Sequence, residues 1–221
     1  MPNQAKYRRY VWELPVRLNH WTNVFCIVVL SVTGFFIGTP FSFGQSASDF
    51  TMGWIRFFHF TAAYLFTISV MCRVIWAFIG NKYSGWREFF PLATAQGREK
   101  FVKMLRYYMF MDKNVPETVG HNPLATSAYI VLFCIYTLMI ITGFAMYALH
   151  APGSSMHWLL EPVYSLFSNQ GMRMAHHFSM WLIFGFVINH IYSAVLFDIK
   201  EHGGEISSIF SGYKFTVKKE K

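Results

Sequence analysis

Histidines within the apolar stretches of the chain are the residues best suited to chemistry, because ionisable groups in such stretches are costly and usually functional. On one stretch, His176 and His190 lie about 21 Å apart at 1.5 Å per helical residue, and fourteen steps of about 100° return to within about 40° of the same face. One helix would therefore present two imidazoles to one side, each near a different membrane surface. His177 lies about 100° from His176, so we predict a supporting or surface role for it.

Four apolar segments are long enough to position these histidines in a membrane, since crossing about 30 Å takes roughly 20 helical residues. They cover residues 20–36, 55–79, 125–149 and 174–197. Of the 221 residues, 54% are hydrophobic and 14% are charged, whereas soluble proteins carry about 25% charged residues. The sequence therefore predicts an all-α, integral membrane four-helix bundle, with residues 1–221 forming a single domain.

The distribution of Lys and Arg predicts the orientation. Basic residues concentrate before the first span, in the loop 80–124 and after the fourth span, whereas the opposite side has only Arg56 and Arg173. Both termini and loop 80–124 should therefore be cytoplasmic.

Residues 98–111 are typical of a helix in the headgroup layer, with plain loop as the alternative, and residues 151–171 suit a surface helix or a docking platform. The net charge of +8 does not indicate nucleic-acid binding, because the basic residues are separated by long uncharged runs.

Depth in the membrane pairs the histidines. His20 should match His190 near the cytoplasm (the inner pair), and His59 should match His176 near the other surface (the outer pair). Zinc usually takes four ligands, whereas a haem needs only two axial ligands from facing helices. The cysteines form no Cys-x-x-Cys pair, which favours non-covalently held haem b at one or both pairs. Each histidine could also simply hydrogen-bond between helices.

Two further residues share faces with the histidines. Gly34 follows His20 by fourteen residues and would let a porphyrin pass close to the helix. Arg73 follows His59 by fourteen residues and could pair with a haem propionate or extend toward the headgroups. Residues 33–35 (TGF) are echoed by residues 142–144 (TGF), which we interpret as close packing, with related helix ends as the alternative.

Several motifs resemble the b-type cytochrome subunit of membrane-bound nickel-iron hydrogenases. The matching residues are 17–21 (RLNHW), 32–34 (VTG), 173–177 (RMAHH) and 190–192 (HIY), and the likeness covers nearly the whole chain. The resemblance implies a multi-pass anchor in the bacterial inner membrane that passes electrons from the iron-sulfur small subunit, which accompanies the nickel-iron large subunit, to quinone. It assigns His59 and His176 to one haem and His20 and His190 to another, and it places Arg17 among the cofactor-binding residues. Where family members often have a further histidine, this chain has Arg173.

Electrons are expected to enter at the outer haem and to leave toward a quinone. Entry would involve Arg56, residues 38–53 and residues 151–171, and His121 is a candidate proton donor or quinone ligand, with an ordinary helix-start residue as the alternative.

Other hypotheses for the function of the chain remain open. The chain could serve formate dehydrogenase or thiosulfate reductase, act alone as a quinol oxidoreductase, or be a haem-free anchor or transporter whose histidines relay protons or bind a metal ion.

Overall fold

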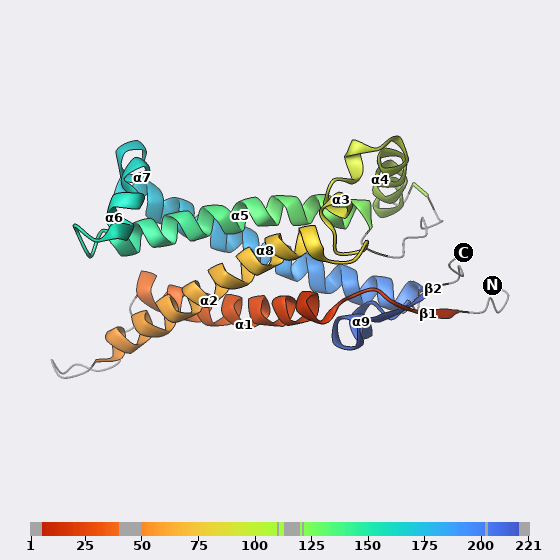
Figure 1. Cartoon of the computed structure of the whole chain (residues 1–221), viewed down its shortest axis with the longest axis horizontal. Coiled ribbons are helices and arrows are strands. Elements are labelled where there is room, and N and C mark those ends of the chain that lie inside the picture. The colour runs from red at the N-terminus through yellow and green to blue at the C-terminus, as the bar shows by residue number, and fades with distance from the viewer. Residues whose placement is uncertain are drawn as a thin grey trace. The chain divides into compact units, whose positions relative to one another are not determined.

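The computed structural model describes residues 6–39, 50–109, 111–112, 120, 122–201 and 203–216, and most of them are helical (Figure 1). Four long helices are α1 (Leu14–Gly38), α2 (Thr51–Ile79), α5 (Pro123–Ala148) and α8 (Asn169–Glu201). All four are long and apolar enough to cross a membrane. The prediction of a mainly helical chain with four candidate membrane spans is confirmed.

All four helices begin before the predicted spans, because caps, as well as hydropathy, set helix boundaries. The start of α5 is an example. The Asn122 side chain accepts a hydrogen bond from the main-chain nitrogen of Ala125, and Pro123 occupies the first turn, where its missing N–H has no cost.

The described chain packs as two compact units, of which the first contains α1 and α2. These helices pack against each other and cross at an angle in the view of Figure 1. Asn19 on α1 donates to both the main-chain oxygen and the hydroxyl of Ser69 on α2, at 2.6 and 2.7 Å. Cys26 on α1 and Phe66 on α2 are buried.

The two ends of the described chain meet in the first unit. Strand β1 (Tyr7–Tyr10) pairs antiparallel with β2 (Tyr213–Thr216), and the short helix α9 (Glu205–Ser211) precedes β2. Trp12 donates to the Ser208 hydroxyl of α9 at 3.1 Å. This strand pair departs from the predicted all-α fold. Strand β1 (YRRY) shows no alternation of apolar and polar residues, and β2 (YKFT) alternates over only four residues, so both leave little signal in a sequence.

The second unit contains α5, most of α8 and four shorter elements. The 3-10 helix η1 (Pro91–Ala93) and α4 (Ala95–Tyr108) contact α5, and α6 (Ser155–Leu159) contacts α5 and is followed by α7 (Glu161–Leu166) (Figure 1). Helix α3 (Trp86–Phe89) follows α2. The predicted surface segment 98–111 is therefore helical through most of its length, and segment 151–171 contains two short helices.

Candidate cofactor site in the membrane helices

The imidazole of His59 is held against α1 by two adjacent residues. Nδ1 of His59 lies 2.8 Å from the hydroxyl oxygen of Thr33. A Cβ added to Gly34 would lie 3.4 Å from Cε1 of the same ring. The glycine therefore lets the ring rest against the helix backbone, while the threonine occupies Nδ1 and leaves Nε2 as the nitrogen for ligation.

The same arrangement recurs around His176 in the second unit. Nδ1 of His176 lies 3.1 Å from the hydroxyl oxygen of Thr142 on α5. A Cβ added to Gly143 would lie 3.1 Å from Cε1 of the ring. Each histidine of the outer pair thus contacts consecutive Thr and Gly residues on a neighbouring helix. The repeated TGF motif therefore does mark close packing, and the group that packs against it is the histidine ring. The sequence predicts that the missing side chain of Gly34 makes room for a porphyrin. In the structure, the imidazole of His59 lies against Gly34.

Each histidine of the inner pair has aromatic neighbours within its own unit. His20 lies edge-on to Trp21, with ring centroids 5.2 Å apart. His190 stacks on Phe186 at 5.7 Å with an interplanar angle of 9°, and it meets the edge of Tyr129 at 6.2 Å. Phe186 precedes His190 by one helical turn on α8, so this stack comes from the helix itself, and Tyr129 contributes from α5.

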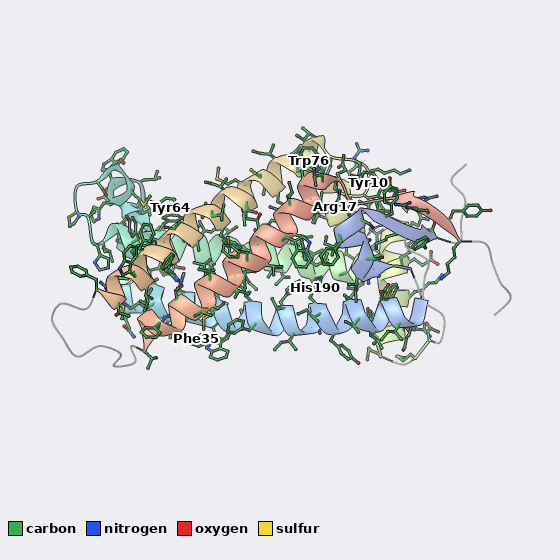
Figure 2. All side chains as sticks on the ribbon, turned by 90° about the horizontal axis from the view of Figure 1, so that it is seen from below. Tyr10, Arg17, Phe35, Tyr64, Trp76 and His190 are labelled. Atoms are coloured by element: carbon green, nitrogen blue, oxygen red, sulfur yellow. The ribbon has the colours of Figure 1, made fainter. Side chains whose placement is uncertain are left out.

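Two arginines predicted to bind the cofactor donate to main-chain carbonyls. Arg17 lies near the start of α1, at the opposite end from Phe35 (Figure 2), and donates to the carbonyl of Phe210. Arg73 is buried in α2 and donates to the carbonyl of Ser84 at 3.1 Å. The bond from Arg73 uses one of the five guanidinium N–H groups, so it is compatible with the predicted contact of Arg73 to a haem propionate.

The remaining candidates lie elsewhere. Arg56, Arg173 and His177 are exposed, and His121 and most of segment 38–53 lie outside the described residues. The structure brings Gly34 to His59 within the first unit, which also contains His20 and Arg73. His176 and His190 share α8 in the second unit.

The sequence profile of the prokaryotic cytochrome b561 family matches residues 11–212, which is most of the chain. The chain belongs to this family. Its relatives include proteins named as probable Ni/Fe-hydrogenase B-type cytochrome subunits. The protein from Cupriavidus necator is 43% identical over 93% of this chain and 86% of the relative. Those from Bradyrhizobium diazoefficiens and Escherichia coli are 40% and 39% identical over 92% and 93% of this chain and 84% and 90% of the relatives.

Sequence reasoning missed two polar residues of this cytochrome b561 family member. The repeated TGF pattern predicts only a packing role for Thr33 and Thr142, whereas the structure shows their hydroxyls bonded to His59 and His176. The recurrence of Thr-Gly in two membrane spans was the available signal. Finding their partners required knowing which helices are neighbours, since the bonded residues lie 26 and 34 positions apart.

Proposed function

We propose that this chain is the membrane-bound, haem b-containing electron-transfer subunit of a nickel-iron hydrogenase, and that it passes electrons from the iron-sulfur small subunit to quinone. Its membership of a cytochrome family, its four apolar helices and the names of its relatives support this proposal. The observation that carries it is the matched surroundings of His59 and His176, each bonded through Nδ1 and packed against glycine.

The residues of the outer pair fit a haem. His59 follows the start of α2 by eight residues, and His176 follows the start of α8 by seven, so each lies about 11 Å into a helix. A donor set of imidazole nitrogens suits haem iron, which takes its other four ligands from the porphyrin. The residues proposed to hold cofactor are His59 with His176, His20 with His190, and Arg73 as a propionate partner.

The bound haem supplies reversible one-electron chemistry. The protein contributes orientation, burial and partner recognition. The threonines and glycines fix the outer imidazoles, and Phe186 and Tyr129 pack around His190. Arg56 and segment 151–171 are proposed to receive the small subunit, and the quinone is proposed to take its proton near His121.

The membrane in question is proposed to be the bacterial inner membrane, with both termini in the cytoplasm. The antiparallel pairing of β1 with β2 supports placing the two ends on one side. The Lys and Arg counts in the connecting segments support the choice of the cytoplasmic side.

The test is the haem content of the purified full-length protein, measured by the pyridine haemochrome method and by a reduced-minus-oxidised difference spectrum. We expect one or two b-type haems per chain. His59→Ala and His176→Ala should each lose one haem, whereas His177→Ala, which changes the exposed neighbour, should keep the wild-type spectrum. A haem-free wild-type protein would overturn the proposal.

The assembly is tested separately by purifying the tagged chain from its native membrane. Recovery of a nickel-containing large subunit supports the hydrogenase assignment. Recovery of a molybdenum-containing subunit in its place would keep the electron-transfer role and assign it to another oxidoreductase.

A further inference from the structure

The two threonines beside the outer pair, Thr33 and Thr142, each donate the hydroxyl proton to a carbonyl of their own helix. Oγ1 of Thr33 lies 2.6 Å from the carbonyl oxygen of Val29, and Oγ1 of Thr142 lies 2.6 Å from that of Leu138. A carbonyl oxygen only accepts hydrogen bonds, and a hydroxyl has a single proton to donate. Each threonine therefore donates to its own helix and has lone pairs left with which to accept.

The direction of the histidine bonds follows from this. Nδ1 of His59 must donate to Thr33, and Nδ1 of His176 must donate to Thr142, at 2.8 and 3.1 Å. Both imidazoles thus carry a proton on Nδ1, and in the neutral ring the lone pair available to a metal is on Nε2.

We infer that Thr33 and Thr142 are positioning residues that fix the tautomer of the outer pair and lower the reduction potential of the haem held by it. This inference rests on the proposed function. An imidazole that donates through Nδ1 to a fixed acceptor is a more basic ligand. A more basic ligand favours the oxidised iron. Because both ligands of the pair carry the same bond, the two effects act in the same direction.

The experiment uses Thr33→Val and Thr142→Val in the full-length protein, with the haem potential followed by spectroelectrochemical titration. Valine keeps the shape of threonine and removes the acceptor. Loss of one hydrogen bond should raise the reduced-to-oxidised ratio at the wild-type midpoint about threefold to tenfold in each variant. For a one-electron couple, a tenfold change is a shift of about 59 mV toward more positive potential.

Matched variants separate this role from packing. Thr33→Ser and Thr142→Ser keep the hydroxyl and should restore the wild-type midpoint. Thr67 and Thr137 make the same bond to a carbonyl one turn earlier, to Ala63 at 2.8 Å and to Phe133 at 2.9 Å. Valine at either control position should leave the midpoint unchanged.

Each outcome decides the inference. Valine variants that keep haem and the wild-type midpoint overturn it. Valine variants that lose haem, with serine variants that keep both haem and midpoint, support it. If the serine variants also lose haem, both threonines act only through packing, and the inference is overturned. A wild-type protein without haem contradicts the proposed function itself, whereas a haem-containing wild type with insensitive threonine variants contradicts this inference alone.

Discussion

The two glycines beside the outer pair approach their histidines to different degrees. A Cβ at position 143 would lie 3.1 Å from the His176 ring, which is closer than ordinary van der Waals contact. A Cβ at position 34 would lie 3.4 Å from the His59 ring, at the edge of ordinary contact. Of these two glycines, Gly143 is therefore the one at which a side chain is less tolerable.

Replacing Gly143 by alanine is expected to push the His176 ring away and to reduce haem affinity at the outer pair about tenfold, the usual scale for disturbing the support of a metal ligand. Gly34→Ala should have a smaller effect. Haem per chain, measured after extended dialysis against an apo-protein haem acceptor, tests this. Gly185→Ala is the control, because a Cβ at that position of α8 would meet nothing within 4 Å. Retention of haem in Gly143→Ala to the same extent as in Gly185→Ala would contradict the prediction.

At the residue scale, histidines can be selected from a sequence because their type, depth and helical face are all encoded locally. The partners of a polar residue are not encoded in this way. Thr33 is 26 positions from its histidine, and the bond depends on how α1 packs on α2. For the same reason, the sequence could suggest a cofactor role for Arg17 but could not reveal that it donates to Phe210 on α9.

Among the elements of the first unit, the start of α1 is tied to the end of α2 by one carboxylate. Oε2 of Glu13 accepts from Nε1 of Trp76 at 3.0 Å, from the main-chain nitrogen of Asn81 at 2.8 Å and from the hydroxyl of Ser84 at 3.1 Å. Ser84 is fully buried, so its hydroxyl depends on protein acceptors. This carboxylate therefore fixes how the two helices meet.

The variant Glu13→Ala leaves these donors without their shared acceptor, and we expect a loss of about 2 kcal/mol in the free energy of unfolding. Glu13→Gln, which keeps one acceptor oxygen, should lose less. Unfolding in detergent followed by tryptophan fluorescence measures both variants.

Glu99 provides the control for Glu13. It forms an exposed ion pair with Lys103 at 2.7 Å on α4. A hydrogen bond from Lys103, together with its charge, lowers the pKa of Glu99, but solvent screens a pair of this kind. Glu99→Ala should therefore change stability little. Equal losses in Glu13→Ala and Glu99→Ala would show that the buried contacts do not hold the helices together.

At the element scale, hydropathy located all four long helices, because about 20 apolar residues in a row have few other uses. It did not reveal β1 and β2. Their pairing brings Tyr7 opposite Thr216 and Tyr10 opposite Tyr213, across nearly the whole length of the chain. A register of this kind is set by the tertiary fold, and each strand alone is too short to predict it.

Over the whole molecule, charge and strand pairing give two independent arguments about topology. Lys and Arg are concentrated in the segments before α1, after α2 and after α8. The pairing of β1 with β2 requires the two ends of the described chain to share one side of the membrane. Four spans satisfy that requirement, because an even number of crossings returns the chain to its starting side.

The expected topology has both ends in the cytoplasm and α6 with α7 on the opposite side. Alkaline phosphatase fused after Lys221 should be inactive, and green fluorescent protein at the same position should fluoresce. Trp158 on α6 is 76% exposed, so Trp158→Cys in a cysteine-free background should react with a membrane-impermeant maleimide in intact cells. A cysteine in place of Lys82, beyond the end of α2, is the matched control and should react only after the cells are opened. Labelling of position 82 in intact cells, or an active phosphatase at the C-terminus, would reverse the orientation. Because the predicted docking of the small subunit depends on segment 151–171 facing outward, such a result would also move the proposed electron entry to the other side of the membrane.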